Sequence, residues 1–241
     1  VEAFPGVNDL PEWDVDSWNV NNTETATLTA SDGAANDEFG LVTAQTDQIL
    51  AVSALKDDTL RGSVYVYFDS DLDRSFSDET AEKLTASDAA DNDHFGVSIA
   101  IDHDILVVGA SQDDDKGSNS GSVYIYYDSD DDGSFTDETP EKLTAYDGAA
   151  SDEFGRSVAI DDNLLVIGSP NANSNGAVYV YHDSNFDNKF SDETPQKLTA
   201  SDGAATDLFG FSVALEQSTI VIGAYNDDDK GTDSGSVYVF T

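Results

Sequence analysis

The amino-acid sequence predicts an all-β protein built from four similar units of roughly 55 residues, the size at which a repeat indicates a solenoid or propeller. Three observations support this. A stretch that reads K-L-T-A-Y-D-G-A-A-S-D-E-F-G at residues 142–155 recurs three more times, with Leu and the Phe of Phe-Gly always 11 residues apart. The segments between these anchors are short and rich in Val, Ile, Tyr and Thr, and clusters of Asp, Gly, Asn and Ser bound them. No segment shows a helical period.

Each unit contains four predicted strands. F-G-x-S-V-A-I, as at Phe154–Ile160, is followed by a short turn and then by a β-branched run such as Leu164–Gly168. A Gly/Ser/Asp loop leads to V-Y-V-Y or V-Y-I-Y, as at Val123–Tyr126, and K-L-T-A ends the unit. Apolar residues stand on both sides of several strands, so each sheet is expected to be covered on both faces. Four-stranded antiparallel units of this kind predict the blades of a β-propeller.

The ends of the repeat region bear on the number of blades. The fourth unit stops at Thr241 after its third strand, and residues 25–30 (T-A-T-L-T-A) match the missing K-L-T-A strand. We therefore predict a propeller of residues 25–241 with four blades, closed by this N-terminal strand, which removes open sheet edges. The alternative is a piece of a larger ring of about seven blades, cut here or completed by self-association. Residues 1–24, with Trp13 and Trp18, are predicted to form an irregular arm.

The Phe-Gly pairs carry a resemblance to a known family. They begin at Phe39, Phe95, Phe154 and Phe209, and a second half of the motif follows as Gly109-Ala110-Ser111, Gly168-Ser169-Pro170 and Gly223-Ala224-Tyr225, with Ser53 in place of the first Gly. The sequence resembles the FG-GAP repeats of integrin alpha-subunit propellers and of many bacterial surface proteins over residues 25–241. The resemblance implies a propeller with a binding role carried by loops, and it names no ligand.

Composition excludes several partners. With 49 acidic and 10 basic residues, the formal charge is −39, which argues against binding to nucleic acid or to anionic membranes. The charge also repels itself, so a salt-adapted (halophilic) or calcium-rich setting is expected. No run approaches the ~20 apolar residues of a membrane helix, so no membrane insertion is expected. The absence of Met and of a signal peptide indicates a mature or excised piece of a longer product.

The connection between the third and fourth strands orders the carboxylates. From the residue before Val-Tyr to the Leu of K-L-T-A, the spacing is 21 residues in all three complete copies. These loops (69–80, 128–139 and 183–194) carry Asp or Asn at positions 1, 3 and 5, and an acidic pair at positions 10 and 11. Ca²⁺ takes six to eight oxygen ligands, which alternate side chains of a tight loop can supply. Position 6 is Gly133, Asn188 or, unfavourably for the left-handed conformation expected there, Arg74.

The predicted Ca²⁺ ligands include the carbonyl of position 7 and the acid at position 10. In the three loops they are Asp69, Asp71, Asp73, Ser75 and Asp78; Asp128, Asp130, Asp132, Ser134 and Asp137; and Asp183, Asn185, Asp187, Lys189 and Asp192. Integrin-type propellers carry their D-x-D-x-D-G loops between strands one and two instead, where this chain has a short turn (Asp102-His103-Asp104). The sites are therefore predicted from the local pattern alone, and the alternative is that the loops are solvated acidic surface.

A second acidic set lies in the anchor stretches. It comprises Asp32 with Asp37, Asp88 with Asp93, Asp147 with Asp152, and Asp202 with Asp207. We favour turns that cap the crossings between blades over a cation-assisted binding face.

Together these observations predict an extracellular, calcium-binding β-propeller that acts as a binding or adhesion module for carbohydrate or protein. It is expected to be a monomeric ring or a domain of a larger chain at the cell surface. A purely structural spacer is the alternative, and a polysaccharide lyase or hydrolase is a third hypothesis. No symmetric His site, G-x-S-x-G motif, P-loop or Cys nucleophile is present, so we expect no catalysis.

Overall fold

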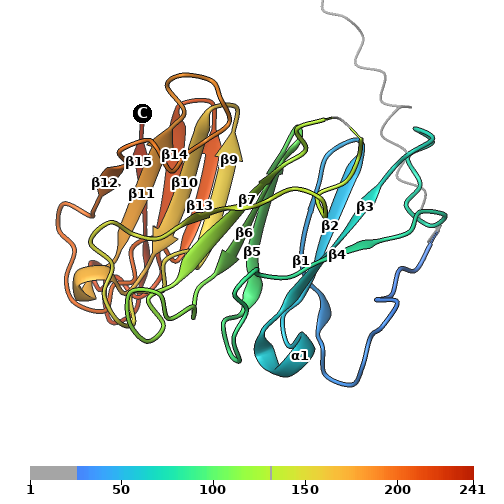
Figure 1. Cartoon of the computed structure of the whole chain (residues 1–241). Helices are drawn as coiled ribbons and strands as arrows, with labels where there is room; N and C mark the ends of the chain where they lie inside the picture. Colours follow the sequence, from blue (N-terminus) through green and yellow to red (C-terminus); the bar gives the residue numbers. More distant parts are fainter. Residues whose placement is uncertain (1–25, 131) are drawn as a thin grey trace, which may run out of the picture.

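The computed structural model describes residues 26–130 and 132–241, which form four antiparallel sheets arranged side by side (Figure 1). The arm predicted for residues 1–24 lies outside the described residues. The strands are β1 (Phe39–Gln45), β2 (Ile49–Ala54), β3 (Ser63–Phe68), β4 (Glu82–Leu84), β5 (Phe95–Asp102), β6 (Ile105–Ala110), β7 (Ser122–Tyr127), β8 (Glu141–Leu143), β9 (Ser157–Asp161), β10 (Leu164–Ser169), β11 (Ala177–His182), β12 (Gln196–Leu198), β13 (Ser212–Glu216), β14 (Thr219–Ala224) and β15 (Ser236–Phe240).

Each sheet is one blade, and its strands follow one another in chain order. Blades 1 to 3 have four strands, and blade 4 has three, β13–β14–β15. The only helical turns among the described residues are α1 (Asp57–Leu60) and η2 (Ala172–Ser174), both in loops between second and third strands. Neither of these is long and apolar enough to cross a membrane. The predicted all-β architecture of four antiparallel blades is confirmed.

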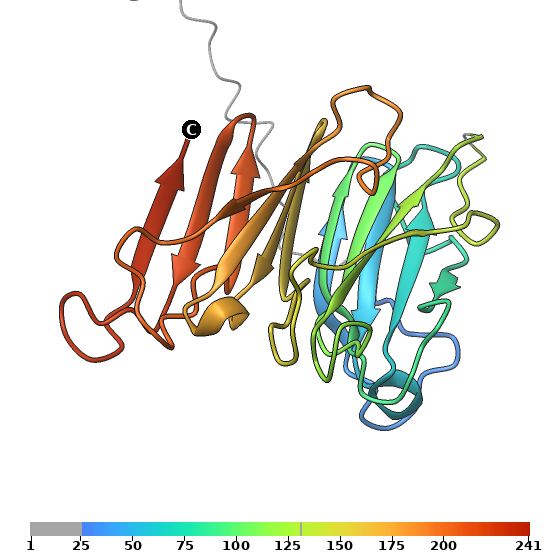
Figure 2. The same ribbon diagram turned by 60° about the vertical axis from the view of Figure 1, so that its left-hand side comes forward.

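The blades pack face to face in sequence. The innermost strands contact one another in the order β1, β5, β9 and β13, and Figures 1 and 2 place blades 1 and 4 at the two ends of an arc. The central strand β6 is buried at every residue because a neighbouring blade covers each of its faces. This explains why the β-branched runs are apolar at consecutive positions rather than at alternate ones.

The predicted closing strand is not formed. Residues 26–30 have no strand conformation, and Leu28 and Ala30 pack against blade 1, on the cluster that contains Tyr65 and Tyr67. They lie there because the anchor stretch crosses from one blade to the face of the next, and this copy precedes blade 1. Blade 4 therefore has no fourth strand among the described residues, and the expectation that residues 25–30 complete it within the same chain is wrong for this structure.

An aromatic pair fixes each anchor on its blade. The Phe of Phe-Gly meets the first Tyr of V-Y edge to face, with ring centroids 5.2–5.4 Å apart in all four copies. This geometry places the positive edge of one ring on the negative face of the other. Phe95, Phe154 and Phe209 have no exposed surface. Phe39 is only half-buried, because it belongs to the first blade of the arc.

The Gly of Phe-Gly allows one blade to approach the next closely. Gly155 has a φ of +87°, and a Cβ on it would lie 2.5 Å from the carbonyl oxygen of Ser122 in the preceding blade. Its own carbonyl accepts a 2.8 Å hydrogen bond from Ser98 Oγ of that blade. The same contact recurs one blade later, where Ser157 Oγ donates to the Gly210 carbonyl at 2.9 Å. Side chains are thus excluded here by the backbone conformation and by the neighbouring blade.

Replacing Gly155 by Ala is expected to cost about 3 kcal/mol of unfolding free energy. About 1 kcal/mol arises from the left-handed backbone conformation, and the remainder from the clash at the blade interface. Gly133→Ala is the matched control, since Gly133 has a φ of +80° but the nearest atom to its Cβ would be 3.6 Å away. It should lose only the conformational contribution of about 1 kcal/mol. Urea unfolding would measure both, and equal losses would show that blade approach does not constrain Gly155.

Candidate metal centres

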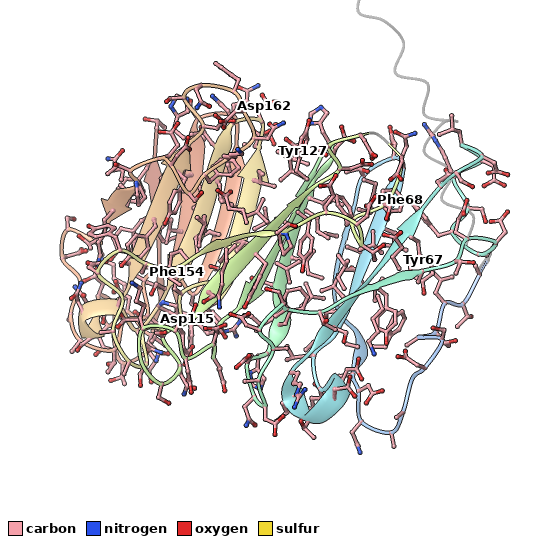
Figure 3. All side chains as sticks on the ribbon, in the orientation of Figure 1. Tyr67, Phe68, Asp115, Tyr127, Phe154 and Asp162 are labelled. Atoms are coloured by element: carbon pink, nitrogen blue, oxygen red, sulfur yellow. The ribbon has the colours of Figure 1, made fainter. Side chains whose placement is uncertain are left out.

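The three acidic loops lie at the opposite end of the sheets from the anchor stretches. Because strands alternate in direction, the turns between first and second strands and the loops between third and fourth strands share one end of each blade. Figure 3 shows this end with Phe68, Tyr127 and Asp162, and the opposite end with Asp115 and Phe154. The chain therefore carries two separate acidic rims.

The Asp at position 1 organises each loop. These residues are no more than 4% exposed in all three loops (Asp69, Asp128 and Asp183). In the second loop, Asp128 accepts hydrogen bonds from the backbone N–H groups of Asp132 (3.3 Å) and Gly133 (3.0 Å). Equivalent bonds to positions 5 and 6 are made in the other two loops. This carboxylate folds the chain back on itself, which brings positions 3 and 5 towards position 1.

The carboxylates at positions 1, 3 and 5 converge in two of the loops. In each of the sets Asp69–Asp71–Asp73 and Asp128–Asp130–Asp132, one carboxylate oxygen per residue lies within 4.8 Å of the others. Lost hydration, and then the charge of Asp73, raise the pKa of Asp71 above its ordinary value. Lost hydration, and then the charge of Asp130, raise the pKa of Asp132 in the same way. A divalent cation would relieve this repulsion.

Position 6 adopts the left-handed conformation expected from the sequence. Its φ is +64° at Arg74, +80° at Gly133 and +61° at Asn188. Arg74 therefore does not prevent the first loop from taking the same shape as the others, although the conformation costs an L-residue about 1–2 kcal/mol.

The remaining predicted ligands are placed unevenly. The acids at position 10 of the first two loops, Asp78 and Asp137, are close enough for their charges to contribute to the raised pKa values of Asp71 and Asp132. The third loop has Asn185 at position 3, so it is not one of the acidic triads. At position 7, the backbone N–H groups of Ser75 and Lys189 donate to the Asp at position 5 of their loops, and the hydroxyl of Ser134 pairs with Thr136. For Asp192 the structure records no such convergence.

A clasp at the base of each loop was not anticipated from the sequence. The carboxylate at position 11 accepts hydrogen bonds from both the backbone N–H and the hydroxyl of the Ser at position 2. These bonds are 2.7–2.9 Å long and join Glu79 to Ser70, Glu138 to Ser129, and Glu193 to Ser184. The Ser–Glu pair recurs at identical spacing in all three loops, which is the signal that could have identified it. Position 11 therefore shapes the loop.

The Phe at position 8 anchors the second and third loops to the preceding blade. Phe135 and Phe190 are fully buried. The backbone N–H of Phe135 donates to Glu82 of blade 1 at 2.9 Å, and that of Phe190 to Glu141 of blade 2 at 3.0 Å. Phe76 is only half-buried. The second and third loops are thus fixed at both the base and the far end.

Open clefts lie between successive acidic loops. One of about 660 Å³ is lined by Phe68 and Leu72 together with acidic residues of the first two loops, including Asp69 and Asp132. Another of about 370 Å³ is lined by Tyr127, Phe186 and acidic residues of blades 2 and 3. Leu72 and Phe186 are 65% and 75% exposed. Apolar side chains therefore stand beside the candidate cation positions.

The short turns between first and second strands carry a further cluster. Asp102, His103 and Asp162 each offer an atom within 4.8 Å of the others. Asp102 already accepts the backbone N–H of Asp162 at 2.7 Å and pairs with His103 Nδ1 at 2.9 Å. This cluster links the rims of blades 2 and 3.

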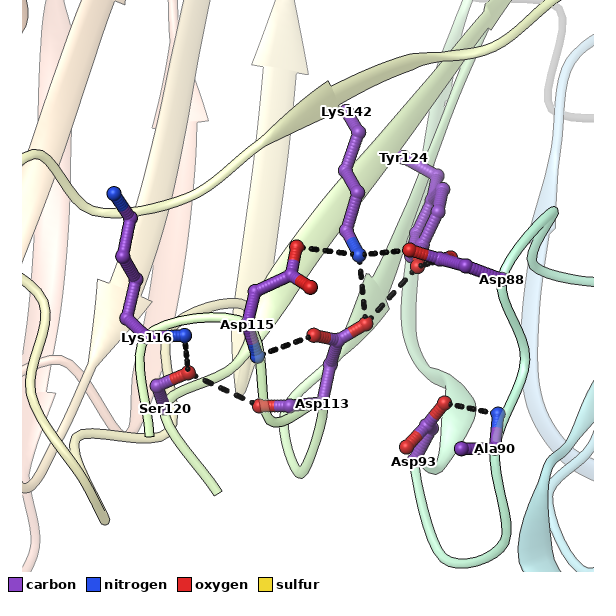
Figure 4. A network of polar contacts seen from close by, with 9 residues as sticks. All are labelled: Asp88, Ala90, Asp93, Asp113, Asp115, Lys116, Ser120, Tyr124 and Lys142. Carbon is purple, nitrogen blue, oxygen red and sulfur yellow. Dashed lines mark hydrogen bonds and ion pairs between the residues drawn. The ribbon is translucent and has the colours of Figure 1, made fainter. Parts of the chain in front are cut away.

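At the opposite rim, a lysine side chain lies among clustered carboxylates. Lys142 Nζ lies 2.6–2.9 Å from carboxylate oxygens of Asp88, Asp113 and Asp115 (Figure 4). The Tyr124 hydroxyl donates to Asp88 at 2.6 Å. Partial burial opposes ionisation of Asp88, but its hydrogen bonds to Lys142 and Tyr124 lower its pKa overall. The ammonium group fills this cluster as a cation would.

The other member of each anchor pair caps a turn. Its carboxylate accepts the backbone N–H of the Ala three residues earlier at 2.5–2.9 Å, in all four copies (Asp37, Asp93, Asp152 and Asp207). The interpretation favoured from the sequence, that the anchor acids cap blade crossings, is confirmed for this member of each pair. The first member binds a Tyr hydroxyl instead, as Asp88 does with Tyr124.

Comparison with known proteins identifies the family. The model of the FG-GAP repeat matches residues 22–67, 79–126, 139–181 and 193–240. The chain belongs to the FG-GAP repeat family, as the Phe-Gly anchors indicated. No match was found among curated proteins. A solved structure, Trypanosoma rangeli sialidase in complex with the inhibitor DANA, is similar with a TM-score of 0.45 and 11% identity over 83% of this chain, which spans 36% of that one.

Removing the Lys142 ammonium is expected to destabilise the protein strongly. Lys142→Gln leaves three carboxylates facing one another, of which the Asp113 side chain is only 5% exposed. Breaking one partner of such a buried cluster costs about 3 kcal/mol. Lys56→Gln makes the same charge change in an exposed pair with Glu38, which should cost no more than about 1 kcal/mol. Thermal unfolding at fixed NaCl compares them, and a loss for Lys142→Gln as small as the control's would contradict a structural role.

Proposed function

We propose that this FG-GAP propeller is an extracellular, calcium-binding module that recognises carbohydrate or protein through the rim carrying its three acidic loops. The observation that supports it is the repeated convergence of carboxylates at positions 1, 3 and 5 of two loops with the same shape. Ca²⁺ prefers such clustered oxygen ligands. Asp128, Asp130 and Asp132, with Asp137 nearby, form the strongest candidate site, and Asp69, Asp71 and Asp73 form the second.

Calcium fits the construction of these loops better than an ammonium group would. The position-1 carboxylate is buried and already oriented by backbone N–H groups, while positions 3 and 5 are exposed and reachable from solvent. Among the described residues, no lysine or arginine forms an ion pair with these triads. Lys142, in contrast, fills the acidic cluster at the other rim. A cation from solution would supply the missing positive charge.

The clefts beside the loops suit a ligand that contacts both a bound cation and an apolar surface. Exposed Tyr127 and Phe186 share one cleft with Asp183, and aromatic faces with nearby oxygen ligands are suited to the apolar faces and hydroxyls of sugars. Loops on a rigid scaffold are the usual place for such recognition. The alternatives, a structural spacer in which calcium provides rigidity alone and a polysaccharide-degrading enzyme, are outcomes of the tests below.

Calcium should raise the thermal unfolding midpoint, and EDTA should lower it. A ligand that binds only the folded state stabilises it by about 4 kcal/mol per site at a thousandfold excess over its dissociation constant. Asp130→Ala/Asp132→Ala should lose the stabilisation from that site. The double variant Asp47→Ala/Asp229→Ala removes the same charge outside the loops and should keep it.

This experiment is best performed at both low and high NaCl. If NaCl alone restores stability and Ca²⁺ adds nothing, the loops are solvated acidic surface. Calcium stabilisation that persists in Asp130→Ala/Asp132→Ala would place the ion elsewhere.

Ligand binding should depend on both calcium and the exposed aromatic side chains. On arrays of glycans and matrix proteins, binding should disappear in EDTA and fall at least tenfold in Tyr127→Ser/Phe186→Ser. Tyr225→Ser alters a residue that directly follows β14 at the opposite rim and is 51% exposed, and this variant should bind normally.

Calcium-dependent stability without binding to any glycan or protein would favour the spacer. Incubation with acidic polysaccharides tests the third hypothesis, and cleavage by the purified chain would overturn the proposal that it is no enzyme.

A further inference from the structure

The two ends of the arc carry the two halves of one blade interface. We propose that two copies of this chain associate head to tail, with blade 4 of each copy packed on blade 1 of the other and residues 26–28 of that copy added to the edge of β15. The proposal is independent of calcium binding and concerns the end faces of the arc. It rests on a comparison of those faces with the three interfaces formed inside the chain.

At each interface, the blade that comes first in the chain contributes its V-Y-V strand. In blade 1, Val64 and Val66 point towards blade 2 and are fully buried in the same cluster as Phe95. Val123 and Ile125 do the same with Phe154 of blade 3. The equivalent residues of blade 4, Val237 and Val239, are 67% and 62% exposed. Blade 4 therefore presents an uncovered apolar face of the kind that a following blade buries.

The surface that the following blade contributes to an interface is also present on blade 1, where it is incompletely covered. Val52, Ala54, Tyr65 and Tyr67 form a small cluster with the half-buried Phe39 and Phe76.

In the blades that follow, the Phe of Phe-Gly and the loop Phe are completely buried, at Phe95, Phe154, Phe135 and Phe190. Leu41, on the first strand of blade 1, is 55% exposed. The missing cover corresponds to a preceding V-Y-V strand.

Polar contacts match in the same way. Inside the chain, Ser98 and Ser157 each donate to a glycine carbonyl of the following blade, at Gly155 and Gly210. Ser212 is the equivalent donor on the exposed face of blade 4. Gly40 is the equivalent acceptor on blade 1, and a Cβ on it would meet no atom within 4 Å.

The strand edges are complementary as well. Outer strands pair with third strands in one register, with Leu84 opposite Val64, Leu143 opposite Val123, and Leu198 opposite Val178. By the repeat, Leu28 would lie opposite Val237. Leu28 already packs on blade 1, so residues 26–28 occupy the position from which an outer strand joins the blade before.

A second copy satisfies both ends without altering the arc. Blades 1 and 4 stand at opposite ends in both views, and joining them within one chain would require all three packed interfaces to change their angle. Two arcs related by a two-fold axis form both missing interfaces at once, and such a heterologous contact closes into a ring. Closure also removes the open edge of β15. Since each chain carries a formal charge of −39, association should require salt.

Sedimentation equilibrium of the chain Val1–Thr241 tests the proposal. In molar NaCl we expect twice the mass of one chain, and a shift to the single-chain mass at low salt. Val237→Asp/Val239→Asp should give single chains at all salt concentrations with an unchanged far-UV spectrum, since these side chains are exposed in one arc. Leu72→Asp/Phe186→Asp changes two equally exposed apolar residues of the acidic loops and should still associate. Single chains at high salt, larger species, or association that survives Val237→Asp/Val239→Asp would overturn the proposal.

Disulfide trapping distinguishes pairing between chains from closure within one. The chain has no Cys, and residues opposite each other in paired strands have Cα atoms within the range that a disulfide bridges. A mixture of Leu28→Cys and Val237→Cys single variants should give a covalent species of doubled mass under oxidising conditions. A mixture of Leu28→Cys with Phe186→Cys should not. If only the double variant Leu28→Cys/Val237→Cys reacts, without a change in mass, the pairing is within one chain and the proposal fails.

Discussion

The fold depends on one tyrosine per blade. The first Tyr of each V-Y strand holds the anchor Phe by its ring and the anchor Asp by its hydroxyl, as Tyr124 does with Phe95 and Asp88. The V-Y strand thus fixes the anchor stretch that crosses from the preceding blade. This stretch in turn brings the Gly carbonyl and other backbone contacts to the interface. In the three complete blades, the lysine of K-L-T-A reaches the same Asp, which neutralises part of the charge. Without this contact, a chain so rich in Asp would have acidic crossings with no reason to lie against the sheet.

The two rims offset their negative charge in different ways. At the anchor rim, lysine ammonium groups are built into the clusters, so these acids are structural and their pKa values are lowered. At the loop rim, hydrogen bonds from the backbone orient one carboxylate per loop, while the pKa values of Asp71 and Asp132 are raised. The nearby lysine therefore distinguishes Asp32, Asp88 and Asp147 from the acidic triads of the loops. The position-1 and turn-capping carboxylates are held by backbone N–H groups instead.

Much of the fold could be predicted from the sequence, because four repeat sequences that form the same packing can be compared with one another. Strand positions and the left-handed residue at position 6 both followed from the pattern. The closing strand did not, because T-A-T-L-T-A fits an outer strand equally well wherever the preceding blade lies, and sequence similarity does not specify the angle between blades. The role of position 11 was missed because the spacing was interpreted in terms of cation ligands only, whereas the partner of this Glu is the Ser nine residues earlier.

The crossings have a consequence for how such a protein can change in length. A repeat that runs from one Phe-Gly to the next does not coincide with one sheet. It contributes the four strands of its own blade and the stretch that docks on the following blade. Every unit therefore carries both surfaces of the interface between blades. Duplication or loss of one whole repeat in the gene would bring the same two surfaces together and create no new type of contact. The number of blades can therefore vary by recombination without any redesign of the interfaces.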